Sequence, residues 1–365
     1  MTIWSTTFAF LMALAVSALA TPIIARLAIT LGAVDRPDER KVNRRANIPL
    51  LGGISVALGF FVGLAAGMLL TPGETGFRSH LEGLLLGGLL VLSVGALDDR
   101  WGLGAIPKLT VQVLAAGIAI AFGFQIDHLT DPISRQVWYF PTWLVWVLTT
   151  IWIVVVTNSF NLIDGLDGLA SGIAAIIAVT LTFIAWQANQ VLGVVVGVAL
   201  VGALLGFLPY NFPPARIFVG DTGALFIGYS LSLLALEGYQ RVTLLTFIVP
   251  LLALAVPLID TLLSILRRVR RRANIMQADR LHIHHRLLES EGSHRSAVLS
   301  LYFLTACFCV IAVSFTRLEG YAAVLFLGMV GLLTIRLLRN LGFFEVAEPG
   351  NPEPQPSARV EGERR

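Results

Sequence analysis

Charged residues are scarce in this sequence: only 13% of its 365 residues are Asp, Glu, Lys or Arg, whereas 56% are hydrophobic. Soluble domains carry about a quarter charged residues, so this composition excludes an ordinary water-soluble enzyme. Apolar runs of about 20 residues, each long enough to cross a bilayer, recur along the chain. We therefore predict an all-α, polytopic membrane protein.

Cysteine is also scarce. The chain has only Cys307 and Cys309, which lie two residues apart in one apolar run and so do not face each other on a helix. We expect neither a disulfide nor a metal site there. No basic region is interleaved with aromatic residues, which argues against nucleic acid as a partner. The first apolar run lacks a basic leader and a small-residue cleavage site, so we do not expect a cleaved signal peptide.

About eleven apolar runs have the length and composition of transmembrane helices. They lie at residues 3–25, 49–70, 81–97, 108–126, 142–160, 168–186, 191–209, 221–239, 243–267, 297–315 and 321–338. The third run is short, and the stretch 127–141 breaks the pattern. We expect one membrane domain over residues 1–344 and a disordered tail, rich in Pro, Glu and Arg, at 345–365.

Lys and Arg are distributed unevenly between the segments that connect these runs. The segments of one side hold all but four of the 26 basic residues, and the four exceptions are Arg78, Arg135, Arg241 and Arg317. Cytoplasmic loops of membrane proteins are rich in Lys and Arg. The pattern therefore predicts that the N-terminus lies outside and the C-terminus in the cytoplasm.

Polar residues gather at four places in this apolar chain, each at the predicted cytoplasmic end of a run or in a cytoplasmic loop. The four clusters are Asp98-Asp99, Asn158-x-x-Asn161-x-x-Asp164-Gly-x-Asp167, Phe218-x-Gly-Asp221 and His282-x-His284-His285-Arg286. Ionisable groups in membrane proteins are costly and usually serve chemistry or transport. Because all four clusters reach one face, we predict a single active site on the cytoplasmic face.

Carboxylates and Asn, without Cys or Met beside them, are hard oxygen ligands that suit Mg²⁺ or Mn²⁺. With so few protein ligands, Mg²⁺ usually completes its shell with water and substrate phosphates. Lys108, nine residues after Asp99, adds a cation suited to a phosphate. The set indicates metal-assisted phosphoryl or pyrophosphate chemistry.

Other interpretations of these residues exist. Asp98-Asp99 alone is more often a helix cap or a solvated loop, and the histidine cluster alone fits a solvated loop or a zinc pair. Asp260, inside the ninth run, fits a buried structural acid as well as a catalytic one, and we leave it out of the site. An ion-coupled transporter would carry its acids near the bilayer midplane within inverted repeats, whereas these clusters lie at helix ends and no repeat is visible.

The four clusters, in this order and spacing, resemble the motifs of the polyprenyl-phosphate N-acetylhexosamine-1-phosphate transferases. The resemblance covers residues 20–310 approximately. Members of that family transfer a sugar 1-phosphate from a UDP-sugar to a polyprenyl phosphate, release UMP and require Mg²⁺. CDP-alcohol phosphotransferases use related substrates, but the Asp-Gly-x-x-Ala-Arg pattern of that family is absent from this chain.

A motif near the N-terminus is similar to the branch of the family that uses UDP-N-acetylglucosamine and undecaprenyl phosphate to initiate O-antigen, common-antigen or teichoic acid synthesis. The matching residues are Asp35-Arg-Pro37-x-x-Arg40-Lys41 and Ile48-Pro49-x-x-Gly52-Gly53. Eleven spans also resemble this branch, since the sister branch that uses UDP-N-acetylmuramoyl pentapeptide typically has ten. Asn43 departs from the pattern, because the branch commonly has His there, and this leaves the donor open. The resemblance implies a multi-pass protein of a bacterial inner membrane and permits a homodimer.

The resemblance also implies a role for each matching residue. Asp221 and Asn161 would hold Mg²⁺, for which Mn²⁺ can substitute. Asp98 would take the proton of the lipid phosphate or orient that phosphate, and Asp99 would support Asp98. Lys108 would bind a phosphate.

The remaining residues would lie around the metal and the donor. Asp164 would lie near the metal or the phosphates, Phe218 would stack on uracil, and Asp167 would bind the edge of uracil. The other substrate-binding residues implied are Asn158, His282, His284, His285 and Arg286. Two mechanisms are open at this point: direct attack by the lipid phosphate and a route through a covalent aspartyl intermediate. We favour direct attack.

Overall fold

The structure is a computed structural model of the whole chain, and it describes residues 3–35, 47–70, 78–130, 136–237, 244–270, 287–288, 292–318 and 320–340. The chain divides into two compact units, Met1–Leu318 and Glu319–Arg365. The second unit contributes one described helix, α13 (Gly320–Asn340). The single domain over residues 1–344 and the disordered tail beyond it stay predictions.

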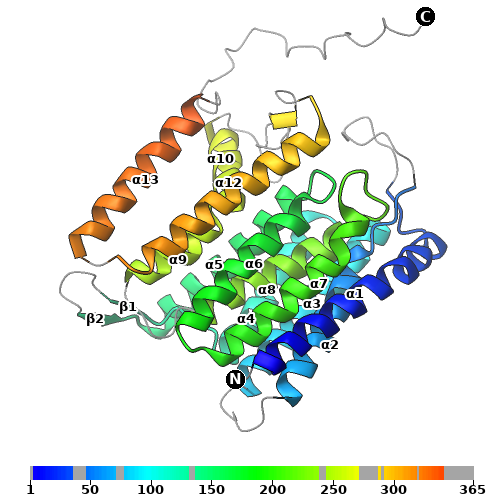
Figure 1. Cartoon of the computed structure of the whole chain (residues 1–365), viewed down its shortest axis with the longest axis horizontal. Coiled ribbons are helices and arrows are strands. Elements are labelled where there is room, and N and C mark those ends of the chain that lie inside the picture. The colour runs from blue at the N-terminus through cyan, green and yellow to red at the C-terminus, as the bar shows by residue number, and fades with distance from the viewer. Residues whose placement is uncertain are drawn as a thin grey trace, which may run out of the picture. The chain divides into compact units, whose positions relative to one another are not determined.

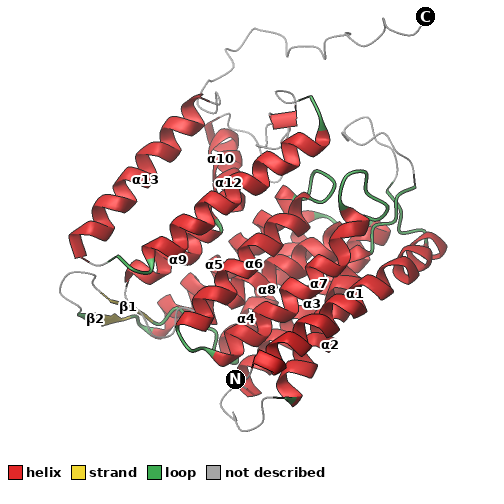
Figure 2. Cartoon of the chain, in the orientation of Figure 1, coloured by secondary structure: helices red, strands yellow, loops and turns green. Residues whose placement is uncertain are grey.

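Helices make up most of the described first unit (Figures 1 and 2). They are α1 (Ile3–Leu31), α2 (Gly52–Leu69), α3 (Arg78–Trp101), α4 (Ala105–Ala121), α5 (Thr142–Ile163), α6 (Leu169–Gln187), α7 (Val191–Asn211), α8 (Gly220–Glu237), α9 (Leu244–Ala253), α10 (Ala255–Arg270) and α12 (His294–Phe315). Among the described residues, seven helices are long and apolar enough to cross a membrane: α1, α2, α3, α5, α6, α7 and α12. The prediction of an all-α, polytopic membrane protein is confirmed.

The stretch 127–141, where the apolar pattern breaks, contains a small antiparallel hairpin. Strand β1 (His128–Thr130) pairs with β2 (Val137–Tyr139), with His128 opposite Tyr139. Each strand has three residues, which is too short for the alternation of apolar and polar residues that reveals a strand in a sequence. The sequence predicts no helix over this stretch, and the hairpin is a small exception to the all-α class among the described residues.

The ninth apolar run, predicted as one span, is divided between α9 and α10 at Leu254. Proline has no backbone N–H, so Pro257 cannot bond to the carbonyl of Ala253 four residues earlier, and its ring crowds that carbonyl. The Sγ atom of Cys309 lies 3.9 Å from this carbonyl oxygen. The break therefore has a local cause in the sequence.

Helices α1, α2 and α7 pack closely through small residues, as membrane helices commonly do. Gly59 and Gly63 of α2 both face Ala13 of α1, and a Cβ added at Gly59 would lie 2.6 Å from the carbonyl oxygen of Ala13. On the facing helix α7, a Cβ at Gly202 would lie 2.5 Å from the carbonyl oxygen of Phe10. The backbones of these helices are therefore in direct contact.

From α1 to α8, successive helices run in opposite directions, so that one end of the first unit collects alternate helix ends. Gly32, directly after α1, lies against Arg100 at the end of α3, and Gly52 at the start of α2 donates a 3.1 Å hydrogen bond to Phe218, just before α8. At the other end, Ser79 near the start of α3 donates a 2.9 Å bond to the carbonyl of Phe122, directly after α4. The end that contains Arg100 and Phe218 is the one that holds the three polar clusters that lie within the described residues.

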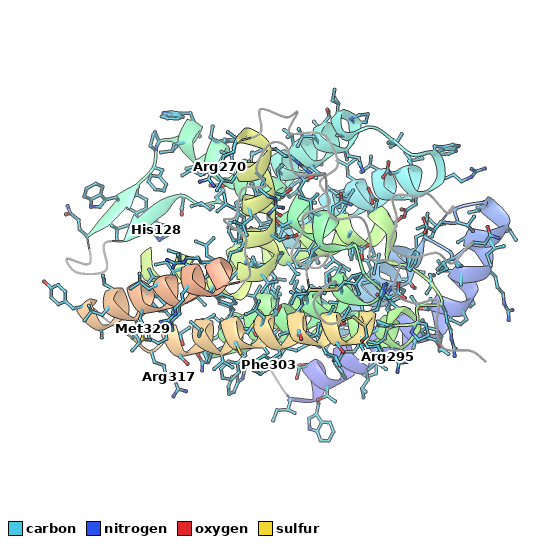
Figure 3. All side chains as sticks on the ribbon, turned by 90° about the horizontal axis from the view of Figure 1, so that it is seen from above. His128, Arg270, Arg295, Phe303, Arg317 and Met329 are labelled. Carbon is cyan, nitrogen blue, oxygen red and sulfur yellow. The ribbon has the colours of Figure 1, made fainter. Side chains whose placement is uncertain are left out.

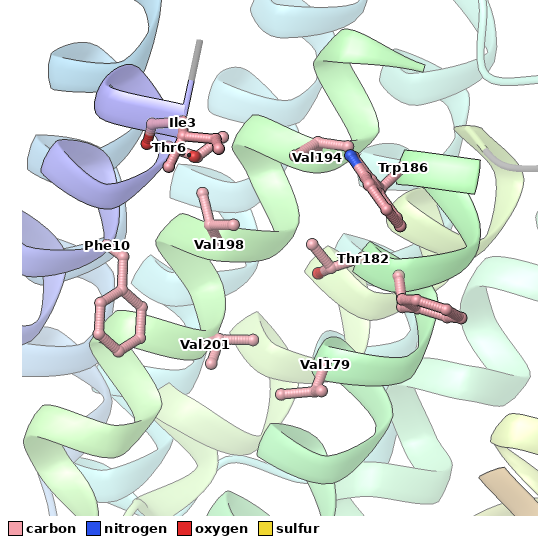
Figure 4. A pocket seen from close by; sticks show the side chains of 10 residues that line it. Ile3, Thr6, Phe10, Val179, Thr182, Trp186, Val194, Val198 and Val201 are labelled. Carbon is pink, nitrogen blue, oxygen red and sulfur yellow. Dashed lines mark hydrogen bonds between the residues drawn. The ribbon is translucent and has the colours of Figure 1, made fainter. Parts of the chain in front are cut away.

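An apolar groove lies between α1, α6 and α7 (Figure 4). Its lining includes Ile3 and Phe10 of α1, Trp186 of α6 and Val198 of α7. Helix α1 begins at this groove and ends beside Arg100, about 43 Å further on at 1.5 Å per residue. The groove is therefore distant from the polar clusters and is not part of the candidate site.

Gly202→Ala should lower the melting temperature of the detergent-purified protein, because the new Cβ would meet the backbone of α1. Overpacking of this kind typically costs about 1–3 kcal/mol. The matched control is Gly117→Ala in α4, where the new Cβ would meet only Trp146, at 3.9 Å. Equal melting temperatures for the two variants would show that the α1–α7 contact is looser than described.

Candidate active site

Lys108 of α4 lies between two carboxylates that come from different helices. Its Nζ atom is 2.9 Å from Oδ2 of Asp98, near the end of α3, and 2.6 Å from Oδ2 of Asp221, in the first turn of α8. The three side chains are at most 26% exposed. The ammonium group offsets the repulsion between two carboxylates that would be costly to bury together. Three of the residues predicted for the site are thus in direct contact.

Asn161, in the last turn of α5, joins this cluster, because its side chain lies close enough to the carboxylate of Asp221 to interact with it. The Oδ1 atom of Asp98 is buried and has no hydrogen-bond partner among the described residues. A buried carboxylate oxygen without a partner is costly, and a hard cation would satisfy it. The oxygen donors of Asp98, Asn161 and Asp221 therefore fit a magnesium ion.

Asp99, the neighbour of Asp98, binds the start of α8. Its Oδ1 accepts the backbone N–H of Asp221 at 2.8 Å, and its Oδ2 accepts the N–H of Thr222 at 3.1 Å and the hydroxyl of Thr222 at 2.5 Å. The first N–H groups of a helix have no partner within the helix, and the helix dipole favours a carboxylate there. Asp99 therefore fixes the position of Asp221, a contact that the sequence did not predict.

Gly220 permits the close approach of α3 and α8 at this point. It has a φ of +67°, which glycine adopts without strain, and a Cβ would lie 2.4 Å from both Asp99 Oδ2 and the carbonyl of Leu50. A Cβ at Gly95 of α3 would lie 2.5 Å from Cα of Thr222. The two backbones thus meet where the carboxylate of Asp99 reaches α8.

Asp164 follows α5 directly and is partly buried. Burial, together with the carboxylates of Asp221, Asp99 and Asp167, raises the pKa of Asp164 well above its usual range. A metal ion bound at this cluster would reverse part of this shift, because it would stabilise the ionised form. The carboxylate of Asp164 therefore interacts with the other acids of the candidate site.

Asp167 holds the segment between α7 and α8. Its Oδ2 atom accepts a 2.9 Å hydrogen bond from the N–H of Ala215, and the side chain is buried. Phe218 in the same segment is partly exposed, and its N–H donates to the carbonyl of Pro49 at 2.8 Å. The two residues predicted to bind uracil are therefore connected through one short piece of backbone.

Asn158, one turn before Asn161, connects α5 to α4. Its Nδ2 donates to Oε1 of the buried Gln112 and, at 2.9 Å, to the carbonyl of Val154. Gln112 lies one turn beyond Lys108 on α4. No sequence pattern indicates Gln112, because a single Gln in an apolar helix forms no motif.

The histidine cluster lies outside the described residues, so the predicted contacts of His282, His284, His285 and Arg286 stay predictions. Within the described ranges, His, Cys, Asp and Glu side chains form no group of three or more arranged to enclose a metal ion. A metal ion at the Asp98–Asp221 cluster would therefore need ligands from Asn161, water or substrate phosphates. Mg²⁺ commonly binds in this way.

The fold and the cluster together define a class: a multi-pass membrane protein with a buried site of carboxylates and Lys108 at one end of its helices. A family model described as glycosyl transferase family 4 matches residues 81–239. The chain is 38% identical over 306 residues to the probable undecaprenyl-phosphate N-acetylglucosaminyl 1-phosphate transferase of Bacillus subtilis (strain 168), covering 84% of this chain and 83% of that protein.

Two further relatives support the same family. The decaprenyl-phosphate N-acetylglucosaminephosphotransferase of Mycolicibacterium smegmatis is 34% identical over 310 residues, covering 78% of this chain and 75% of that protein. The undecaprenyl-phosphate alpha-N-acetylglucosaminyl 1-phosphate transferase of Escherichia coli (strain K12) is 28% identical over 301 residues, covering 79% of this chain and 78% of that protein. The chain belongs to glycosyl transferase family 4, and the resemblance drawn from the four polar clusters is confirmed.

Asp99→Asn should lower both the melting temperature and the transferase activity, the latter by about tenfold or more. The Asn amide would turn an NH₂ group toward N–H and O–H donors, and each hydrogen bond to a charged group contributes about 1.5–3 kcal/mol. Ser232→Ala on α8 is the control, because the Ser232 hydroxyl bonds only within its own helix, at 2.7 Å to the carbonyl of Tyr229. Wild-type activity and stability in Asp99→Asn would contradict the capping role.

Proposed function

We propose that this protein transfers N-acetylglucosamine 1-phosphate from UDP-N-acetylglucosamine to a polyprenyl phosphate in the bacterial inner membrane. The names of the relatives specify transfer of N-acetylglucosamine phosphate and undecaprenyl or decaprenyl phosphate for those proteins. The contact of Lys108 with Asp98 and Asp221 is the observation that carries the proposal for this chain. A cation-containing acidic site at the ends of membrane helices suits a reaction between a lipid phosphate and a water-soluble nucleotide.

In this reaction, an oxygen of the lipid phosphate attacks the phosphorus that carries the sugar. A new phosphorus–oxygen bond forms, and the bond from this phosphorus to the oxygen bridging the donor's two phosphates breaks, so that UMP leaves with the bridging oxygen. A phosphate oxygen is already a competent nucleophile, and the protein mainly has to align two anions. We therefore favour direct attack over a covalent aspartyl intermediate.

Residues of the cluster divide the tasks of this reaction. Asp98 would accept the proton of the lipid phosphate or orient that phosphate, and Lys108 would neutralise charge on the phosphates. Mg²⁺, or Mn²⁺ in its place, would be held by Asp221 and Asn161 and would supply positive charge at the donor diphosphate. The oxygen donors of the cluster and the unpartnered Oδ1 of Asp98 support this assignment. Asp164, whose carboxylate interacts with that of Asp221, would act on the same metal or phosphates.

The nucleotide would be bound beside this cluster. Phe218 would stack on uracil, and Asp167 would bind the edge of uracil from the turn before α6. The partial exposure of Phe218 and the hydrogen bond from Ala215 to Asp167 support a shared pocket for the base. Asn158 and the histidine cluster would contact the remainder of the donor, the latter through the diphosphate and the sugar.

We also propose that eleven segments cross the membrane, with the N-terminus outside and the site facing the cytoplasm. Besides the seven long apolar helices, α4, α8, the α9–α10 pair and α13 would cross. The distribution of Lys and Arg supports this orientation. Trp138 and Trp143, which are 61% and 67% exposed, would anchor the outer face, as aromatic residues commonly do at membrane interfaces.

Purified protein should release UMP from UDP-N-acetylglucosamine when polyprenyl phosphate and Mg²⁺ are present, and a chelator should stop the reaction. Asp221→Ala should lower the rate by about a thousandfold, because it removes a metal ligand and a partner of Lys108. The control is Asp127→Ala, which removes a carboxylate that is 51% exposed and bonded to His128. If no UDP-N-acetylhexosamine supports turnover by the wild-type protein, the proposed function is wrong.

Orientation can be tested with reporters fused after Arg365. Green fluorescent protein fused there should fluoresce in a bacterial host, because its folding requires the cytoplasm, whereas alkaline phosphatase at the same place should stay inactive. An active phosphatase and a dark fluorescent protein would reverse the proposed topology and place the site on the outer face.

A further inference from the structure

Helix α12 contributes no residue to the predicted site, yet it binds two segments that do. The hydroxyl of Tyr302 donates a hydrogen bond to the carbonyl of Gly168, the residue directly after Asp167. The Nε atom of Arg295 donates a 3.0 Å hydrogen bond to the carbonyl of Pro213, in the segment between α7 and α8. Side chains of one helix therefore hold two separate parts of the chain.

These two side chains lie on one face of α12. Residues 295 and 302 are seven positions apart, which is about two helical turns and about 10.5 Å along the axis. Val298, one turn after Arg295, is fully buried, so this face is turned toward the rest of the first unit. Figure 3 shows Arg295 at one end of α12 and Arg317 beyond the other. Arg295 thus lies at the end that is close to the candidate site.

Both segments lie close together where α12 reaches them. Gly168 has a φ of +73°, and a Cβ there would lie 3.1 Å from Cα of Phe212, the residue before Pro213. A Cβ at Gly172, one turn into α6, would lie 1.9 Å from the hydroxyl oxygen of Tyr302. The ring of Tyr302 therefore reaches α6 because residue 172 has no side chain.

These hydrogen bonds link α12 to the chain beside both residues predicted to bind uracil, Asp167 and Phe218. Asp167 binds the N–H of Ala215, which lies two residues after Pro213 and three before Phe218. Tyr302 holds the chain beside Asp167, and Arg295 holds the chain before Phe218. The separation between Asp167 and Phe218 is therefore set by α12 as well as by the hydrogen bond from Ala215 to Asp167.

We propose that Tyr302 and Arg295 are positioning residues of the donor pocket, which hold Asp167 and Phe218 at the separation that uracil requires. The inference rests on the proposed function, because it takes these two residues as the binding site of the base. Tyr302 and Arg295 act through Asp167 and Phe218 and do not touch the substrate. Their effect should be specific to the nucleotide sugar, because Asp98, Lys108 and Asp221 are held by α3, α4 and α8.

The test compares steady-state kinetics of full-length Tyr302→Phe and Arg295→Met with the wild-type protein. Each variant should raise KM for UDP-N-acetylglucosamine about fivefold, as expected for the loss of one hydrogen bond. Both kcat and the KM for polyprenyl phosphate should change little. Arg295→Lys keeps a donor that can reach a carbonyl, so its KM should lie between those of the wild type and Arg295→Met.

Ser314→Ala is the matched control on the same helix, because the Ser314 hydroxyl bonds only to the Val310 carbonyl one turn earlier, at 2.8 Å. It should leave both KM values unchanged. An active wild type with an unchanged donor KM in Tyr302→Phe and Arg295→Met overturns this inference alone. The inference is also overturned if KM rises equally for the donor and for polyprenyl phosphate and the melting temperature falls, because these changes indicate a general loss of protein stability. A wild type without turnover overturns the proposed function, and the inference with it.

Discussion

Several carboxylates must be held together at the ends of membrane helices, and the rest of the structure depends on how their repulsion is offset. Lys108 neutralises part of the charge by binding Asp98 and Asp221 at once. The N-terminus of α8 neutralises another part, since its N–H groups bind Asp99. Oδ1 of Asp98 still lacks a hydrogen-bond partner among the described residues, and burial and the neighbouring carboxylates raise the pKa of Asp164. A metal ion at this cluster would satisfy such oxygens and favour their ionised form, and it would in turn attract phosphates.

The close contact between the backbones of α3 and α8 fixes the positions of the carboxylates whose repulsion has to be offset. Gly95 and Gly220 bring α3 against the start of α8, so Asp99 can reach two N–H groups and one hydroxyl. Asp98 and Asp221 therefore cannot move apart without breaking the cap of α8. A metal site built on these two residues gains its precision from the helix packing. A location at helix ends also lowers the desolvation cost of the acids, because water and a soluble donor can reach them.

The sequence predicted the members of the acidic cluster because they form spaced motifs in an otherwise apolar chain. Asp98, Lys108, Asn161 and Asp221 do lie together. Thr222, Gln112, Tyr302 and Arg295 were missed, since each is a single polar residue whose importance depends on a partner distant in the chain. The break between α9 and α10 has its cause in Pro257, but apolar length alone predicted one span. Periodicity therefore predicts helices and clusters, whereas three-dimensional contacts decide which polar side chains position the others.

The two parts of the site are held by different helices, and this separation has a consequence for specificity. The acidic cluster is held by α3, α4, α5 and α8, and its chemistry concerns phosphates that every donor of this kind shares. The turn of Asp167 and the segment of Phe218 are held by α12, through Gly168 and Pro213, and by the hydrogen bond from Ala215 to Asp167. If Asp167 and Phe218 bind the base as proposed, a change at the α12 contacts would alter nucleotide affinity without moving Asp98 or Asp221. Members of one family can therefore keep a common phosphoryl-transfer centre while the strength of donor binding changes independently.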